Sequence, residues 1–260
     1  MSTVSTLPAL TPNAWLRWDV VSRLLPPQVR TVLEIGCGQG SMGTRLAATT
    51  DYLGVEPDAS SCAVAQGRVA ALGRGEVRQG LLDDVVEPSR TFDLVCSFEV
   101  IEHIEDDVAA LKGWVGRVRP GGWVLLSTPA FAHRYGPSDA MVGHFRRYDP
   151  PVFAQLLRDA GLVQEQVVVY GAGLGNVLER ARNVIGARRL RKAGKPVPKG
   201  SPAGLDAATM AELTSGSGRL FQPPAAAGTA VQYATAPFRV LQRRFPERGT
   251  GLVALARRPG

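Results

Sequence analysis

Short apolar runs alternate with stretches of helical periodicity along most of this chain, and that alternation constrains the fold more than any other feature. The expected strands are residues 31–35, 52–55, 76–79, 92–97, 123–128, 163–170 and 251–256. The runs are continuous rather than alternating, as in strands that are covered on both faces. Strand–helix alternation of this kind indicates βαβ units. We therefore predict an α/β fold with a doubly wound parallel sheet.

The chain changes character between the sixth and the last expected strand. Residues 1–170 hold 15 Lys and Arg against 19 Asp and Glu, whereas residues 171–260 hold 15 against 4, so the formal net charge of +7 belongs to the second part. Apolar residues at helical spacing accompany the basic ones there. We expect residues 1–170 and 250–260 to form one domain. Residues 171–249 are then a basic, mainly helical insertion, either a substrate cap or a surface-docking element.

The basic residues of this insertion concentrate near its start, at Arg180, Arg182, Arg188, Arg189, Arg191, Lys192, Lys195 and Lys199. Three kinds of partner would suit such a charge. They are an anionic small substrate, an anionic membrane surface that carries a lipid-linked substrate, and RNA. RNA is the weakest of the three, because the insertion has few aromatic residues for base stacking. A solvated basic face with no ligand is the alternative to all of them.

The compartment is indicated by what the sequence lacks. The three cysteines, Cys37, Cys62 and Cys96, are odd in number and match no zinc or CxxC spacing, which favours reduced thiols. The first residues show no basic start followed by an apolar run, and no apolar stretch approaches 18 residues. We expect a cytoplasmic protein, with peripheral membrane contact as an additional option.

A glycine-rich turn follows the first expected strand. Gly36, Gly38 and Gly40 allow a sharp turn and a close approach of the backbone to a ligand, and the following helix start favours polar or anionic groups. Glu56 ends the second strand, where a carboxylate can accept hydrogen bonds from both ribose hydroxyls. These residues indicate an adenosine-containing ligand. On their own they do not distinguish a nicotinamide enzyme from an enzyme that uses an adenosyl cofactor.

Four segments in order carry a resemblance to a known family. They are EIGCGQG at 34–40, VEPD at 55–58, FDLV at 92–95 and RPGGW at 119–123. Together they resemble the class I S-adenosylmethionine-dependent methyltransferases, over residues 30–170 and the last strand. The resemblance implies a Rossmann-like seven-stranded sheet whose last strand is antiparallel. It also implies S-adenosyl-L-methionine as methyl donor, bound over the carboxyl ends of the strands.

The resemblance also assigns cofactor-binding positions. Gly36, Gly38 and Gly40 would line the methionine part, Glu34 would support their loop, and Glu56 would hold the ribose. The family often has an acid directly after the glycine of the third strand, but here two leucines intervene, so the adenine contact falls to Asp83 or to the backbone near Leu82. The full set of expected cofactor-binding residues is Glu34, Gly36, Cys37, Gly38, Gly40, Glu56, Pro57, Leu82, Asp83 and Phe98.

An E-x-x-E-H motif, formed by Glu99, Glu102 and His103, follows the fourth expected strand. Offsets of three and four would place all three side chains on one face of a helical turn. Two carboxylates and an imidazole are suitable ligands for a divalent metal. His144 comes later, in GHFRRYDP at 143–150 just before a helix, and could supply a fourth ligand. In the same loop, Arg147 either binds an anionic substrate group or anchors the loop through ion pairs.

This motif resembles a subset of the family, the ubiquinone-biosynthesis O-methyltransferases and the small-RNA 2′-O-methyltransferases, which bind a divalent ion through E-x-x-E-H. The resemblance implies a metal, Mg or Mn, at Glu99, Glu102, His103 and His144. A metal would lower the pKa of an acceptor hydroxyl and orient it for attack on the sulfonium methyl. The alternative is a metal-free site in which His103 or His144 acts as catalytic base.

The resulting functional expectation is O-methylation of a hydroxyl on a small-molecule, sugar or lipid-linked acceptor. Three alternatives stay open at this point. The first is a metal-independent N- or C-methyltransferase, and the second is an RNA 2′-O-methyltransferase. The third comes from another class, either a NAD-dependent oxidoreductase, which the E-x-x-E-H motif does not favour, or a non-catalytic cofactor-binding protein.

Overall fold

A computed structural model of the protein describes residues 7–195, 197 and 225–260. Its strands join one sheet in the order β3-β2-β1-β4-β5-β7-β6. The strands are β1 (Thr31–Ile35), β2 (Asp51–Glu56), β3 (Glu76–Gln79), β4 (Phe92–Phe98), β5 (Val118–Pro129), β6 (Val163–Tyr170) and β7 (Gly251–Arg257). All pairs are parallel except those of β7, which runs antiparallel to both β5 and β6. This confirms the predicted doubly wound, Rossmann-like fold with an antiparallel last strand.

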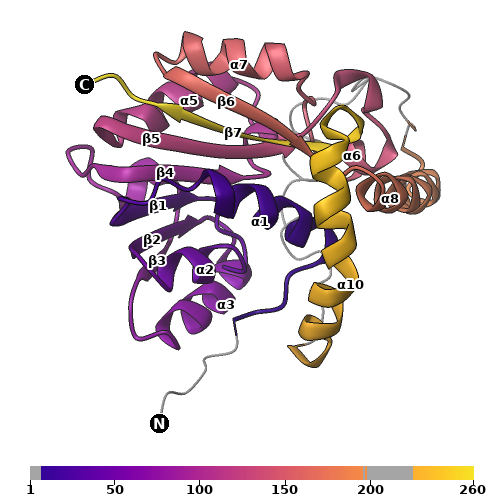
Figure 1. The fold of residues 1–260 in the computed structure, drawn as a ribbon, viewed down its shortest axis with the longest axis horizontal. Helices are drawn as coiled ribbons and strands as arrows, with labels where there is room; N and C mark the ends of the chain where they lie inside the picture. The colour runs from indigo at the N-terminus through magenta and orange to yellow at the C-terminus, as the bar shows by residue number, and fades with distance from the viewer. Residues whose placement is uncertain (1–6, 196, 198–224) are drawn as a thin grey trace.

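Helices cover both faces of the sheet (Figure 1). The α-helices are α1 (Pro12–Leu24), α2 (Gly43–Ala47), α3 (Ala59–Ala70), α4 (Leu82–Val85), α5 (Asp107–Gly116), α6 (Pro137–Met141), α7 (Pro150–Asp159), α8 (Leu174–Lys192) and α10 (Ala225–Arg244). Short 3₁₀ helices are η1 (Ile101–His103), η2 (Ala132–Arg134) and η4 (Pro246–Arg248). Among the residues that the structure describes, no helix is long and apolar enough to cross a membrane.

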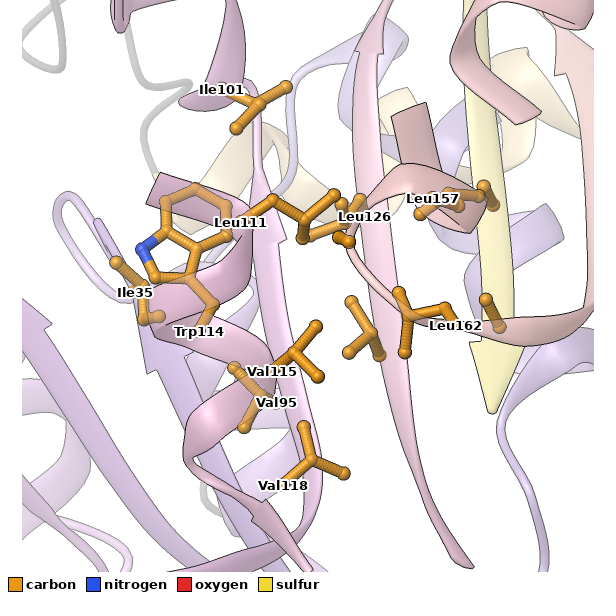
Figure 2. Packing of buried hydrophobic residues seen from close by; sticks show 14 of the residues in the cluster. Ile35, Val95, Ile101, Leu111, Trp114, Val115, Val118, Leu126, Leu157 and Leu162 are labelled. Carbon is orange, nitrogen blue, oxygen red and sulfur yellow. The ribbon is translucent and has the colours of Figure 1, made fainter. Parts of the chain in front are cut away.

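The continuous apolar strands form a core on each face of the sheet. On one face, Val95 of β4 and Leu126 of β5 belong to a cluster with Leu111 and Trp114 of α5, and Leu157 of α7 joins it (Figure 2). The second cluster packs β-strand residues against α1, α2 and α3. Both faces of β1, β2, β4 and β7 are therefore buried, which explains why apolar residues do not alternate with polar ones there, whereas the edge strands β3 and β6 are partly exposed and carry polar residues.

The fifth strand is longer than its sequence predicts. The predicted strand began at Trp123, whereas β5 begins at Val118. The pairing of β4 with β5 shifts register between Phe92 and Leu94, so this stretch is an irregular strand start. Gly121 has a positive φ of 73°, which a glycine adopts without strain.

Two helices of the expected insertion, α8 and α10, lie between β6 and β7 in the chain. The carboxylate of Asp19, on α1, accepts hydrogen bonds from Gln242 Nε2 at 3.0 Å and from Arg243, which ties α10 to α1. The first helix begins at Pro12, because the Thr11 side chain accepts the capping bond from the Ala14 amide. Lys199, expected in the basic stretch, lies outside the described residues, and the division of the chain into domain and insertion stays a prediction.

Candidate active site

A large cavity opens at the carboxyl ends of the parallel strands. Its volume is about 1530 Å³, and its wall includes the glycine turn after β1, the end of β2 and the residues that follow β4. The chain runs from β1 to β2 and β3 on one side of the sheet, and from β4 to β5 on the other. The strand order therefore reverses between β1 and β4, and open α/β sheets bind ligands at such a reversal. The expected cofactor residues that line the cavity are Glu34, Gly36, Cys37, Gly38, Glu56, Pro57, Leu82, Asp83 and Phe98.

The turn after β1 uses glycine for two physical reasons. Gly36, Gly38 and Gly40 have φ angles of 69°, 54° and 74°, a region in which side-chain-bearing residues are strained. A Cβ on Gly36 would also lie 2.6 Å from a methyl carbon of Val100. Gly40 is absent from the cavity wall and packs instead against Ala65 of α3. The backbone of this turn is therefore free to approach a ligand on the cavity side.

Glu56 is held by the same turn. Its Oε2 accepts a hydrogen bond from the Gly38 amide at 2.8 Å, and its Oε1 accepts one from the Asp58 amide at 2.9 Å. Burial raises the pKa of the Glu56 carboxyl, while these two backbone bonds lower it. Each carboxylate oxygen keeps a second lone pair. Glu56 can therefore accept two further hydrogen bonds from a diol in the cavity, as a ribose would require.

Glu34 lies beneath the turn. Its Oε2 accepts a hydrogen bond from the Tyr52 hydroxyl at 2.6 Å. Burial raises the pKa of Glu34 to about 8, although the bond from Tyr52 opposes this shift. A Cβ on Gly43, in the first turn of α2, would come within 2.7 Å of the Glu34 carboxylate. The Glu34–Tyr52 pair therefore supports the base of α2 and the glycine turn that precedes it.

At the expected adenine position, Leu82 and Asp83 differ in their surroundings. Leu82 is buried and lines the cavity, whereas the Asp83 side chain is 87% exposed and forms an ion pair of 2.6 Å with Arg117. Arg117 also donates to the Val86 carbonyl, so the pair fixes α4 against the end of α5. Asp83 thus has a structural partner in this fold. Its contact with adenine stays a prediction, and Leu82 supplies the apolar wall.

The prediction that the E-x-x-E-H motif lies on one face of a helical turn is wrong. Glu99 has a positive φ of 60°, and the 3₁₀ helix begins only at Ile101. This backbone reversal sends the Glu99 carboxylate to Arg17 of α1, at 3.1 Å, and to the Ser127 hydroxyl, at 3.0 Å. Glu99 therefore binds different partners from those of Glu102 and His103, although its charge still acts on Glu102. Arg17, which also bonds the Tyr170 hydroxyl, was missed because it lies far away in the sequence.

Glu102, His103 and His144 meet in space. One ligand atom from each of them lies within 4.8 Å of the others, and Glu99 is not part of this group. The Glu102 side chain is fully buried, with its Oε2 accepting from the Thr128 hydroxyl at 3.1 Å. Among the described residues, Glu102 Oε1 has no hydrogen-bond partner, and His144 Nε2 lies 3.8 Å from it. Burial, with the nearby Glu99 charge, raises the pKa of Glu102 well above its usual range.

The imidazole of His144 is oriented by a buried chain of ion pairs. Asp139 Oδ1 lies 2.9 Å from His144 Nδ1, and Arg147 binds the same carboxylate at 2.8 Å. Arg147 also pairs with Glu179 of α8, which in turn binds Arg134. Burial would raise the pKa of Asp139, but His144 and Arg147 lower it to about 2. The ionised carboxylate therefore accepts a hydrogen bond from Nδ1 of His144 and turns Nε2 toward Glu102.

These contacts answer the question that the sequence left open for Arg147. Its side chain is 3% exposed and anchors the loop through ion pairs. Asp139 and Glu179 were not predicted from the sequence. Neither belongs to a recognisable motif, and Glu179 is bound by Arg134 of η2 and by Arg147, both far from it in the chain.

His103 completes the group from η1. Its ring lies edge-on to that of His144, with centroids 4.6 Å apart, and its Nδ1 is 3.3 Å from the Gly143 carbonyl. Burial, together with the neighbouring His144, lowers the pKa of His103 to about 3. Its imidazole is therefore neutral near pH 7.

The chemistry of this donor set fits a divalent cation. One buried carboxyl oxygen without a partner among the described residues and two imidazoles are compatible with Mn²⁺, Fe²⁺, Co²⁺ or Zn²⁺, and less with Mg²⁺, which prefers oxygen ligands. The hydrogen bond from His144 to Asp139 is the outer-sphere contact typical of metal-binding histidines. The residues that would hold the ion are Glu102, His103 and His144, without Glu99.

Comparison with known proteins identifies the family of this chain. Residues 12–167 match the family described as a methyltransferase domain. A protein of Mycolicibacterium smegmatis, named "Probable S-adenosylmethionine-dependent methyltransferase", is 31% identical over 74% of this chain and 77% of its own length. A ubiquinone biosynthesis O-methyltransferase of Azorhizobium caulinodans is 34% identical, over 40% of this chain and 42% of its own length.

Solved structures share the fold at low sequence identity. A SAM-dependent methyltransferase from Archaeoglobus fulgidus superposes with a TM-score of 0.55 at 12% identity, covering 95% of each chain. The matched domain spans the glycine turn, Glu56 and the Glu102–His103 segment, and the relatives bear the same activity in their names. The chain therefore belongs to the class I S-adenosylmethionine-dependent methyltransferases.

Proposed function

We propose that the protein transfers the methyl group of S-adenosylmethionine to a hydroxyl oxygen of a small-molecule, sugar or lipid-linked acceptor, with a divalent cation at Glu102, His103 and His144. The observation that carries the proposal is the Glu102 Oε1 atom, which is buried and has no hydrogen-bond partner among the described residues. A buried polar atom is costly unless something binds it. Two imidazoles within 4.8 Å supply the remaining ligands for such a group.

The chain's own residues prepare the two substrates. The glycine turn and Glu56 bind the donor at one end of the cavity. The group of Glu102, His103 and His144 faces the same cavity through its two histidines and receives the acceptor. A divalent cation there would lower the pKa of the acceptor hydroxyl and so favour its attack on the sulfonium methyl. Asp139 keeps the His144 imidazole in one tautomer and one orientation.

The pKa of His103 favours a ligand role for this residue over a catalytic-base role. A catalytic base works best when its pKa lies near the working pH. At about 3, the pKa of His103 is too low for efficient proton abstraction near pH 7. In a metal-free reaction, His144 would be the remaining candidate because it lines the cavity and Asp139 orients its ring. This is the remaining form of the metal-independent alternative.

A methyl-transfer screen tests the proposal. Labelled S-adenosylmethionine is incubated with protein and with phenols, sugars, glycolipids or short RNAs, in strong chelator and with added Mn²⁺. We expect label on an oxygen of a non-RNA acceptor and an increase of at least about tenfold with Mn²⁺. His103→Ala and His144→Ala should abolish transfer and keep S-adenosylhomocysteine binding. Full activity in chelator, or full activity of both variants, would contradict the proposed metal site.

A further inference from the structure

The cavity continues beyond the proposed catalytic group to the basic helix α8. Arg182, Ile185 and Arg189 line its wall. Their offsets of three and seven place them on one face of the helix. Ile185 is 48% exposed, so this face is not packed against the rest of the described structure. The face therefore presents two guanidinium groups, with an apolar side chain between them, to the cavity.

This face of α8 is held firmly relative to the site. A Cβ on Gly186 would lie 2.8 Å from the Pro137 carbonyl, so α8 and α6 approach closely at this glycine. The Ser138 amide donates to the Asn183 side chain at 3.0 Å, and Glu179 carries the ion pairs of Arg134 and Arg147. The two cavity-lining arginines therefore project from a fixed helix.

Other cavity-lining arginines have acidic partners, but these two do not. Arg17 pairs with Glu99, and Arg147 pairs with Asp139 and Glu179. For Arg182 and Arg189, no described residue forms an ion pair or a hydrogen bond with the guanidinium group. The one acid on this part of α8, Glu179, is already engaged by two other arginines. Two positive charges at the cavity wall are thus left for a ligand.

Arg182 and Tyr170 line the same cavity. Burial raises the pKa of Tyr170 to about 12, while the positive charges of Arg17, which binds the Tyr170 hydroxyl at 3.1 Å, and of Arg182 act in the opposite direction. Arg189 lies seven residues further along α8, roughly 10 Å away at 1.5 Å per residue.

We propose that Arg182 and Arg189 bind an oxyanion of the methyl acceptor, a phosphate or a carboxylate, and so select anionic acceptors. This inference rests on the proposed function, because it names the acceptor class of the same site. A planar guanidinium donates two parallel hydrogen bonds to a phosphate or carboxylate, which gives both affinity and orientation. Ile185 would contact the apolar part of the acceptor between the two charges.

A binding experiment tests the two arginines without knowledge of the acceptor. Pyrophosphate is titrated calorimetrically into metal-free protein that is saturated with S-adenosylhomocysteine. Arg182→Gln/Arg189→Gln should weaken binding by at least about tenfold, as loss of charge-assisted hydrogen bonds predicts. The matched control is Arg180→Gln/Arg188→Gln, which removes the same charge from exposed positions of α8 outside the cavity wall. Pyrophosphate affinity of the control should change less than about threefold.

A turnover experiment separates the two oxyanions. Methyl transfer is compared within two pairs of acceptors, 3,4-dihydroxybenzoate against catechol and glucose 6-phosphate against glucose. The inference is supported if the wild-type protein and the control prefer the anionic acceptor and the Arg182/Arg189 variant does not. The pair of acceptors that shows this preference identifies the oxyanion as a carboxylate or a phosphate.

The two claims fail in different ways. Absence of S-adenosylhomocysteine binding to the wild-type protein would overturn the proposed function and the inference with it. If S-adenosylhomocysteine binds, but pyrophosphate does not bind or binds equally to all variants, the inference alone is wrong.

Discussion

The imidazoles of His103 and His144 meet edge to face, with ring centroids 4.6 Å apart and ring planes at 82°. One comes from the 3₁₀ helix after β4 and the other from the loop after α6. The contact exists because strands β4 and β5 are parallel neighbours and the segments after both reach the same edge of the sheet. It places both rings beside the buried Glu102 carboxylate and makes this group the chemical centre of the cavity.

Asp139 should act as a positioning residue for His144. We expect Asp139→Asn to lower methyl transfer by about 10- to 100-fold, the usual effect of losing an outer-sphere partner of a metal ligand. S-adenosylhomocysteine affinity, measured by calorimetry, should stay within about threefold, because the donor site lies at the other end of the cavity. Asp159→Asn, at the exposed end of α7, is the control and should be fully active. Unchanged turnover in Asp139→Asn would show that His144 needs no such support.

Glu56 should determine donor affinity. Glu56→Gln keeps the shape of the side chain but removes the charge and half of the acceptor capacity at the ribose position. We expect S-adenosylhomocysteine to bind about 10- to 100-fold more weakly. The control is Glu105→Gln, an exposed acid that also lines the cavity. Equal affinities of the two variants would place the ribose elsewhere.

Glu34 should make stability fall as the pH rises. Its folded-state pKa is raised to about 8, so between about pH 4.5 and 8 the folded protein holds a proton that the unfolded chain has lost. The free energy of unfolding therefore decreases with pH in this window, by up to about 1.4 kcal/mol per pH unit. Glu34→Gln, which stays neutral and can still accept from Tyr52, should remove this slope. Urea unfolding at pH 5, 6.5 and 8 measures it, and an identical slope in both proteins would refute the assignment.

Asp19 should give the opposite pH dependence at acid pH. Burial alone would raise its pKa, but hydrogen bonds from Arg243 and Gln242 lower it below the usual value. Its stabilising contribution is complete above the unfolded pKa of about 3.9 and is lost as the pH falls through the folded value.

The same contacts predict a loss of stability at neutral pH. Asp19→Asn should cost about 1–3 kcal/mol at pH 7 by removing the charge between α1 and α10. Chemical unfolding at pH 7 and pH 3 tests this, with a smaller difference between the proteins expected at pH 3. If the difference in unfolding free energy between the two proteins were the same at pH 7 and pH 3, the charge of Asp19 would not be the source of the stabilisation.

The fold could be predicted from the sequence because it depends on local patterns. The strands 31–35, 76–79 and 163–170 have the predicted limits, and the remaining strands differ at their ends. The largest difference is at β5, which begins five residues before the predicted start, in an irregular stretch that contains Gly121 and Gly122. Because glycine adopts many backbone conformations, these residues do not reveal where the strand begins.

The candidate site was predictable only in part. Glu56 and the glycine turn follow strand ends in fixed order, so a linear motif identifies them. Glu99 has a positive φ, which turns its side chain away from the group formed by Glu102, His103 and His144. Helical spacing in the sequence cannot predict such a backbone reversal. Asp139 contacts His144 from five residues earlier, but Glu179 joins this network only through Arg147, 32 residues before it in the chain. Such contacts depend on how helices pack, which residue spacing does not encode.

The most direct test of the proposed metal site is a titration of chelator-treated protein with Mn²⁺, followed by electron paramagnetic resonance. The spectrum reports bound ion without any need for the acceptor. We predict one bound Mn²⁺ per chain, lost in Glu102→Gln and retained in Glu99→Gln, which removes the neighbouring acid outside the ligand group. No bound Mn²⁺ in the wild-type protein, or equal binding by both variants, would contradict the account.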